Sequence, residues 1–141
     1  MTVRWRDQLR EMALNYADRV DLAARKSVIE TAVDVERRAK ANFVGSHRRG
    51  QPHVGGNKPN VVSGDLRRSI QIRPPVRTAK GSWKCDVGPN MIYGARVEFG
   101  YRGTGGGPGQ HTTRPFPYMA PAIRAAQPGV RRTVMRWVRA I

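Results

Sequence analysis

The chain has 141 residues, 26 of them Lys or Arg and 10 Asp or Glu, which gives a formal net charge of +16 and room for one domain rather than two. A lone cysteine, Cys85, excludes an intramolecular disulfide framework and fits a reducing compartment. No apolar run approaches the ~20 residues that span a bilayer and the first residues contain no signal-peptide h-region. We therefore expect a chain that contacts no membrane and stays in the cytoplasm unless it leaves inside something larger.

Residues 1–44 predict one long helix. Apolar side chains recur at steps of three or four from Leu9 to Phe43, and charges of both signs alternate between them. No Gly or Pro interrupts the pattern, so we expect the helix to overhang a small globule or to pack against a neighbouring subunit. Two shorter helices with a bend near residues 25–27 are the alternative, and Gly45 is the expected C-cap.

Residues 45–62 are rich in Gly, Pro, Asn and basic side chains and lack periodicity, which predicts a flexible basic loop. Residues 63–100 predict antiparallel strands. Ser63, Gly64 and Asp65 begin either a short helix over residues 66–69 or a turn into a strand. Alternating apolar positions then indicate three strands, over residues 70–73, 83–87 and 93–99.

Residues 101–114 are a Gly-rich loop, and residues 115–141 predict a helical segment that begins near Met119. We expect Pro128 to split this segment into a short and a longer helix. The expected fold is α+β, a single domain with a long N-terminal helix and a C-terminal helix packed on a small antiparallel sheet of three to four strands, with two long Gly-rich loops.

The Gly-rich loop does not match a phosphate-binding P-loop, because it has no Lys followed by Ser or Thr and no helix begins directly after it. The three histidines, His47, His53 and His111, and Cys85 fit no structural-zinc spacing. No nucleophile, base and acid are arranged for catalysis. We therefore expect no cofactor, no metal and no enzymatic activity.

Glu98 lies between two apolar residues and is expected to form a strand-face salt bridge with a neighbouring arginine; a buried functional acid is the alternative. The aromatic residues on the strands could stack nucleic-acid bases. Tyr93 and Phe99, however, fall on the apolar face of their predicted strand, where core packing is the ordinary explanation.

The charge is unevenly distributed. Residues 1–43 carry nine basic and seven acidic side chains (9 − 7 = +2), and residues 44–141 carry seventeen and three (17 − 3 = +14). Such an excess suits a polyanion or the acidic face of another protein, although no sequence-reading motif for nucleic acid is present.

Three short segments, taken in their order along the chain, are similar to the motifs of a known protein family. They are "SGDLRRSI" from Ser63, "YGARVEFG" from Tyr93 and "PFPYMAPAI" from Pro115, preceded by the long helix. Together they resemble the gene-product-ten-like tail-component family of long-tailed bacteriophages over roughly residues 20–141. The departures are Gly94, where Ala is commoner in the family, and an unusually long glycine loop.

The resemblance implies a virion protein at the neck or head-proximal end of the tail, made in the host cytoplasm. Its implied role is a neck or tail-completion subunit that forms a homo-oligomeric ring and joins the tail to the head connector. Implied partners are its own copies, the connector or stopper, the tail terminator and the tail tube, with non-specific contact to DNA in the lumen. A basic nucleic-acid-binding module without enzymatic activity is the alternative. The candidate interface residues are Arg48, Arg49, Leu66, Arg67, Arg68, Tyr93, Glu98, Phe99, Arg102, Arg114, Phe116, Arg131, Arg132 and Arg136.

Overall fold

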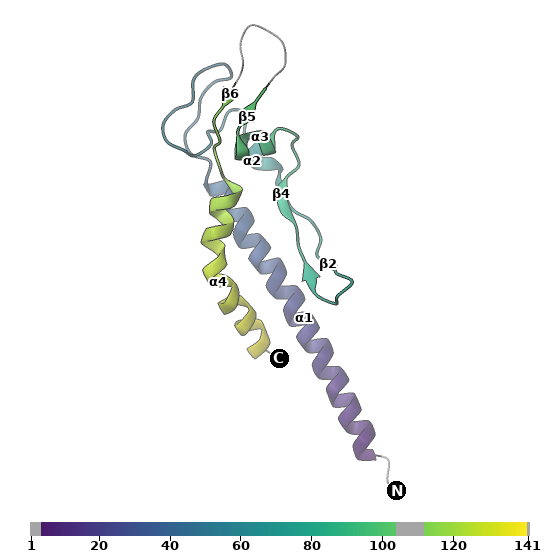
Figure 1. Ribbon diagram of the computed structural model, residues 1–141. Helices are drawn as coiled ribbons and strands as arrows, with labels where there is room; N and C mark the ends of the chain where they lie inside the picture. The colour runs from purple at the N-terminus through teal and green to yellow at the C-terminus, as the bar shows by residue number, and fades with distance from the viewer. Residues whose placement is uncertain (1–3, 104–111, 141) are drawn as a thin grey trace.

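The computed structural model describes residues 4–103 and 112–140 and shows an α+β chain built on two antiparallel helices (Figure 1). The C-terminal helix runs back along the upper half of the long first helix. The short helices lie near the upper end of the pair, and part of the strands extends downward beside the first helix. In chain order the elements are α1 (Arg4–Ala41), α2 (Asp65–Ser69), β1 (Ile70–Ile72), β2 (Val76–Arg77), β3 (Trp83–Lys84), β4 (Val87–Pro89), α3 (Gly94–Phe99), β5 (Tyr101–Arg102), β6 (Thr112–Thr113) and α4 (Met119–Arg139).

The prediction of a single long N-terminal helix is confirmed, because α1 has no break near residues 25–27. Ser27 is buried there, and its hydroxyl donates to the carbonyl of Ala23 at 2.8 Å, so the polar group is satisfied inside the helix. The helix ends at Ala41, earlier than expected. Gly45 is not its C-cap: it adopts φ +75° further along and accepts a hydrogen bond from the Val61 amide at 2.9 Å, where the two ends of the next loop meet.

The expected sheet of three to four strands is wrong, because the strands found within residues 4–103 and 112–140 form three two-stranded antiparallel pairs. β1 pairs with β4, β2 with β3, and β5 with β6. The first two pairs make one interrupted ribbon in which Pro74-Pro75 replaces two ladder donors and separates β1 from β2. The Arg73 amide still donates to the Asp86 carbonyl at 2.8 Å and holds the two pairs in line.

The third expected strand is also wrong, because residues 94–99 form the helix α3. Its inner face is Gly94, Val97 and Glu98, which share the i, i+3, i+4 spacing of a helix, whereas the alternation over residues 93–99 predicted a strand. A segment this short satisfies both periods, and its packing decides between them. As a result Phe99 is 78% exposed and Tyr93 is 41% exposed, so neither is a core side chain.

The short helix over residues 66–69 is formed, and α4 begins at Met119 as expected. The expected split at Pro128 does not occur, because α4 continues through it. Pro128 and Arg124 are both exposed, so water can hydrate the Arg124 carbonyl that loses its helical donor.

The core lies where the upper part of α1 meets α4, α2 and β1. Phe43 and Tyr118 pack with ring centroids 5.1 Å apart, and Asn42 donates from its amide to the Tyr118 carbonyl at 2.9 Å. Small residues at Ala39, Ala122 and Ala126 let the two helices approach closely. The remaining core residues are Val35, Leu66 and Ile70.

Candidate assembly surfaces

The lower end of α1, residues 4–20, projects beyond the rest of the molecule (Figure 1), and we call this segment the overhang. Every residue in it is exposed. Trp5, Leu9, Met12 and Tyr16 are 55–66% exposed, and with Val20 they follow steps of 4, 3, 4 and 4, which place them on one face of the helix. We call these five side chains the stripe. The expectation that the helix overhangs the globule is confirmed.

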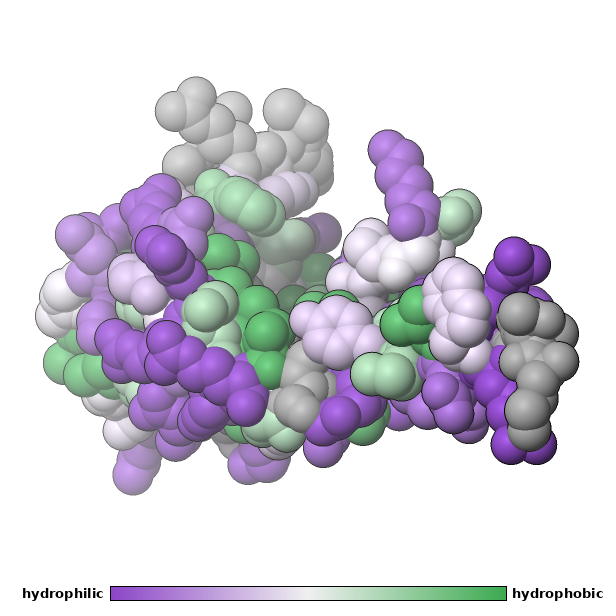
Figure 2. All heavy atoms as spheres, turned by 90° about the horizontal axis from the view of Figure 1, so that it is seen from below, coloured by the Kyte–Doolittle hydropathy of each residue, from purple (hydrophilic) through white to green (hydrophobic). Residues whose placement is uncertain are grey.

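A second uncovered apolar surface is an open groove of about 290 Å³ in the body of the molecule, formed by α1, α4 and the ribbon between them. Figure 2, which views the molecule from below, shows apolar surface on this face among strongly hydrophilic side chains. The lining is mainly aliphatic and comprises Ser27, Val28, Thr31, Ala32, Val35, Cys85, Val87, Met119, Ile123, Val130 and Val134. We call it the groove.

The expected strand-face salt bridge of Glu98 is wrong, because this buried carboxylate caps α4. One oxygen accepts from the backbone amides of Tyr118 and Met119 at 2.7 and 2.9 Å, and the other accepts from that of Ala120 at 2.9 Å. These amides are donors that the first turn of a helix leaves unsatisfied, and a negative charge there also suits the helix dipole. Glu98 therefore fixes where α4 begins relative to α3.

Tyr118 and Gly94 complete this junction. The Tyr118 hydroxyl donates to the Gly94 carbonyl at 3.2 Å, and burial with the nearby Glu98 carboxylate raises the pKa of Tyr118 to about 12. A Cβ atom on Gly94 would lie 2.6 Å from the Pro89 ring and 3.0 Å from the Tyr118 hydroxyl. Glycine is thus required by the close approach of α3 to these neighbours.

The loop after α1 is organised around Asn60. Its side-chain amide donates to the carbonyls of Val44 and Val54 at 2.7 and 3.2 Å, and its oxygen lies 2.9 Å from Nδ1 of His47. Ring stacking adds a second contact: His53 lies 4.0 Å from Phe116, measured between ring centroids. The expected flexibility of this loop stays a prediction, because these contacts describe one conformation and not its mobility.

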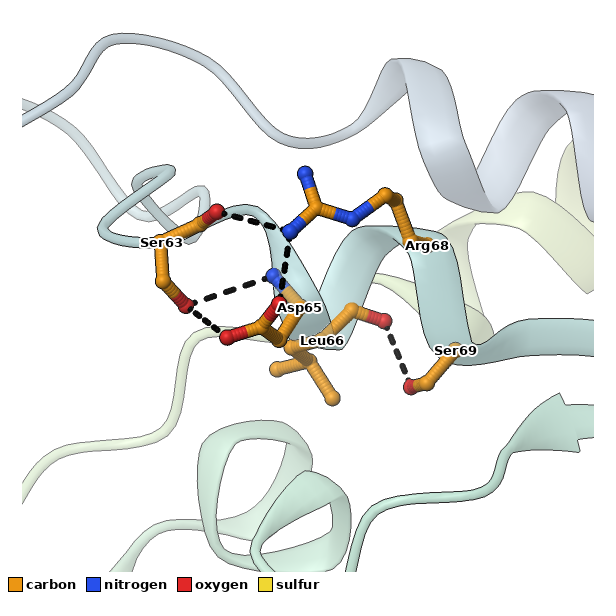
Figure 3. A network of polar contacts seen from close by, with 5 residues as sticks. All are labelled: Ser63, Asp65, Leu66, Arg68 and Ser69. Atoms are coloured by element: carbon orange, nitrogen blue, oxygen red, sulfur yellow. Dashed lines mark hydrogen bonds and ion pairs between the residues drawn. The ribbon is translucent and has the colours of Figure 1, made fainter.

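The start of α2 is held by a local polar network (Figure 3). The Ser63 hydroxyl donates to Asp65 at 2.6 Å, and the Arg68 guanidinium donates to the Asp65 carboxylate at 2.6 Å and to the Ser63 carbonyl at 3.1 Å. These hydrogen bonds, that from Ser63 first, lower the pKa of Asp65. Arg68 therefore has a local structural role, and Leu66 beside it lies in the core.

Arginines follow the outer face of α4. Arg124, Arg131, Arg132 and Arg139 are exposed, and spacings of seven or eight residues place them along one side of the helix. Arg136 differs, because it pairs with Glu30 of α1 next to the hydrogen bond from the Trp137 indole to the same carboxylate at 2.8 Å. These hydrogen bonds lower the pKa of Glu30 and join α4 to α1.

The structure does not gather the fourteen candidate interface residues into one site. Arg48, Arg49, Arg67, Arg131 and Arg132 are exposed, whereas Leu66, Glu98 and Phe116 are buried. Arg114 donates to the Gly56 carbonyl at 2.8 Å and lies over the Phe116 ring. Arg102 lies in β5. Most of the predicted loop of residues 101–114 lies outside the described residues.

The overhang was expected from the sequence, but none of the stripe residues was among the candidate interface residues, and the groove was missed. The stripe was visible as periodicity, but the same periodicity also describes the covered half of α1. The groove had no sequence signal, because its lining comes from segments far apart in the chain.

Within residues 4–103 and 112–140, no three His, Cys, Asp or Glu side chains lie close enough together to hold a metal ion. In the same part of the chain, no helix is long and apolar enough to cross a membrane. No family model, curated protein or solved structure matches the chain.

Proposed function

We propose that the protein is a structural virion protein of a tailed bacteriophage, a neck or tail-completion subunit without enzymatic activity that assembles into a ring and joins the tail to the head connector. The observation that carries the proposal is the overhang. Soluble monomers rarely expose a continuous apolar surface, and such a surface usually marks a protein interface. In an assembly the stripe contacts a neighbouring subunit, whereas an isolated nucleic-acid-binding module has no protein neighbour to cover it.

The three segments that resemble the tail-component family support the proposal, because they meet in space. The first forms α2 and enters β1, the second forms α3 with Glu98, and the third begins α4 under the Glu98 cap. Their residues build one junction, which accounts physically for their occurring together in one chain.

The proposed partners are other copies of this chain and the neighbouring connector, stopper, terminator and tail-tube proteins. The proposed location is the virion, reached from the host cytoplasm. Basic loops and the arginines of α4 suit acidic surfaces on adjacent rings, because complementary charge favours correct association.

Deletion of the gene from the phage genome tests this proposal. We expect unjoined heads and tails in electron micrographs of the lysate, and expression of the gene in trans should restore joined particles. Joined, infectious particles from the deletion strain would overturn the proposed function.

A second candidate function, non-specific nucleic-acid binding, is favoured by the exposed arginines of α4. Replacing Arg131, Arg132 and Arg139 with Ser should weaken DNA binding and reduce the slope of log K against log salt by roughly 0.9 for each phosphate that is no longer neutralised. Arg37→Ser on α1 is the matched control, because Arg37 pairs with Asp34 at 2.5 Å and lies on another helix. Absence of any DNA shift at low salt would eliminate this candidate.

A further inference from the structure

A third uncovered apolar surface is a pocket of about 280 Å³ near the upper end of the helix pair, where the loop after α1 meets α2 and α3. We call it the loop pocket. Its lining reaches from the core to the surface, because Phe43, Leu66 and Phe116 are buried whereas Val62 and Arg67 are exposed. We propose that the loop pocket binds one aromatic or large aliphatic side chain of an acidic segment of a partner protein. The inference rests on the proposed function, because that function supplies the neighbouring proteins that would carry such a segment.

The loop pocket has room for an aromatic ring. A cavity of about 150 Å³ lined by aliphatic and aromatic side chains is large enough to bind benzene, and the loop pocket is larger than that. Aromatic rings already line it: Tyr93 is 41% exposed, and His53 stacks on Phe116 with ring centroids 4.0 Å apart. An entering ring would remove apolar area of both partners from water, and contacts between rings add to that gain.

Polar side chains in the lining are already engaged within the chain. Asn60 uses both its amide nitrogen and its oxygen within its own loop, and Ser63 donates its hydroxyl at the start of α2. One ring nitrogen of each histidine is engaged as well, that of His47 with Asn60 and that of His53 with the Lys58 carbonyl, each at 2.9 Å. A nucleobase in the pocket would lose the hydrogen bonds that its polar edge makes with water, whereas an apolar side chain has none to lose. The lining therefore favours an apolar side chain over a base.

The apolar lining continues into a basic one. A neighbouring depression is lined by Lys40, Arg67 and Arg68, and it shares residues 61–64 and Arg67 with the loop pocket. Among the described residues, neither lining contains an Asp or a Glu. The segment that forms much of both walls, residues 44–69, carries five basic residues and one acidic residue (5 − 1 = +4). Acidic residues beside the apolar anchor of a bound segment would therefore meet positive charge.

Arg67 is the cation available for such an acidic residue. Lys40 pairs with Glu36 and Arg68 pairs with Asp65, each at 2.6 Å, and Figure 3 shows Arg68 turned toward Asp65. Arg67 is exposed and forms no ion pair with any residue of 4–103 or 112–140. A free guanidinium can bind a carboxylate through two parallel hydrogen bonds. Arg67 thus selects for acid beside the pocket, and the pocket selects for an apolar side chain.

Charge also favours an acidic partner over a second copy of this chain. The chain carries +16, most of it in residues 44–141, so two copies that approach through this face bring like charges together. The stripe and the groove contain no charged side chain that would select an occupant in this way. The loop pocket combines an uncovered apolar surface with a charge that specifies its partner.

Selection from a random library of short peptides displayed on yeast tests the proposal with the full-length protein. We expect the enriched peptides to share an aromatic or large aliphatic residue with Asp or Glu beside it. Replacing that apolar residue with Ala in a synthetic copy should weaken binding about 30-fold or more, because it removes the anchor. Failure to enrich any peptide, or enrichment of peptides that lack either the apolar or the acidic residues, would overturn the inference.

Two pairs of variants locate the binding site. Arg67→Glu should weaken binding of an enriched peptide about 10-fold or more at low salt, because it reverses the charge beside the pocket. Arg131→Glu changes the net charge equally but lines neither depression, so it should have less than about a 2-fold effect. Val62→Ser should weaken binding about 3-fold or more, whereas Val33→Ser on α1 should not; the two valines are 48% and 49% exposed.

Fluorescence anisotropy of the labelled peptide measures these affinities, and circular dichroism should show that all four variants are folded. Equal effects of Arg67→Glu and Arg131→Glu would mean that only net charge attracts the peptide. Displacement of the peptide by a single-stranded oligonucleotide whose own binding requires Arg67 would assign the pocket to nucleic acid. Self-association of the wild type that Arg67→Glu abolishes would make a second copy the occupant. Each of these three results contradicts the proposal.

The two proposals fail separately. If the peptides and variants behave otherwise than expected while the gene deletion leaves heads and tails unjoined, the loop pocket is wrong and the joining function stands. If peptide binding at the loop pocket is confirmed but the deletion strain makes joined particles, the pocket stands and the function is wrong.

Discussion

The two ends of α1 have the same kind of sequence and opposite surroundings. From residue 23 onward α4 and the ribbon cover most of its apolar face, and Ala39 is completely buried. From residue 4 to residue 20 the apolar face is uncovered. Periodicity thus identifies the face of a helix that packs, but not what packs against it. We call the described residues from 23 onward the body.

The largest difference should appear between two aromatic residues, one just after the end of α1 and one on its overhang. Phe43→Ala in the body should lower the free energy of unfolding by about 3–5 kcal/mol, because it leaves a cavity against Tyr118. Tyr16→Ala on the overhang should change it by less than about 0.5 kcal/mol. Urea unfolding at low protein concentration measures both, and similar losses would mean that the overhang is packed within the monomer.

A similar comparison separates two glutamates. Glu98→Ala should cost about 3 kcal/mol, because three backbone amides at the start of α4 lose a charged acceptor. Glu11→Ala on the overhang should cost less than about 0.5 kcal/mol, and Glu98→Gln, which keeps one amide oxygen as acceptor, should lie between them. If Glu98→Ala were as stable as the wild type, Glu98 would not stabilise the start of α4 as a cap.

High pH should weaken the body through Tyr118. Its pKa is raised in the folded protein to about 12, above the ordinary value of 10, so the associated stability is complete below pH 10 and is lost as the pH rises toward 12. The loss is roughly 1.4 kcal/mol per pH unit, or about 2–3 kcal/mol in total. Between pH 10 and 12, the free energy of unfolding measured with urea should fall more steeply in the wild type than in Tyr118→Phe. Parallel curves of the two proteins against pH would argue against the raised pKa of Tyr118.

The smallest effects concern two glycines of the body. Gly94→Ala should cost about 1–3 kcal/mol, because the new methyl group meets the Pro89 ring. Gly129→Ala in α4 should instead stabilise by about 0.5–1 kcal/mol, since nothing lies within 4 Å of its added carbon and alanine favours helix. Thermal melts suffice, and a stable Gly94→Ala protein would show that α3 can move away from β4.

Much of the helical frame was predictable from sequence, because α1 and α4 repeat their pattern over several turns. The strand-rich part was not, for two reasons. Residues 94–99 fit both periods, and only the amides of Tyr118 to Ala120 explain why a helix that presents Glu98 is formed. The sequence indicated that a strand ends at Pro74-Pro75. It could not show that the chain continues as a second strand pair in the same ribbon, because that depends on which strands pair with one another.

The candidate interface residues show the same limit. Arg131 and Arg132 are exposed, but charge alone could not show that Arg68 and Arg136 are paired with acids within the chain. Leu66 and Phe116 were chosen from sequence segments and are core side chains. The apolar surfaces that remain uncovered became visible only once the covered ones were placed.

The continuity of α1 makes the overhang a lever. Its tip lies about 25 Å beyond the residues that hold the helix to the body, at about 1.5 Å per residue. A tilt of about 10° at the body would move the tip sideways by about 4 Å, roughly half of the 8–10 Å that separates the axes of packed helices. Small repacking between α1 and α4 could therefore move the tip out of contact with a neighbour while leaving the melting temperature unchanged, and the angular precision of the body would set the tolerance of whatever the tip touches.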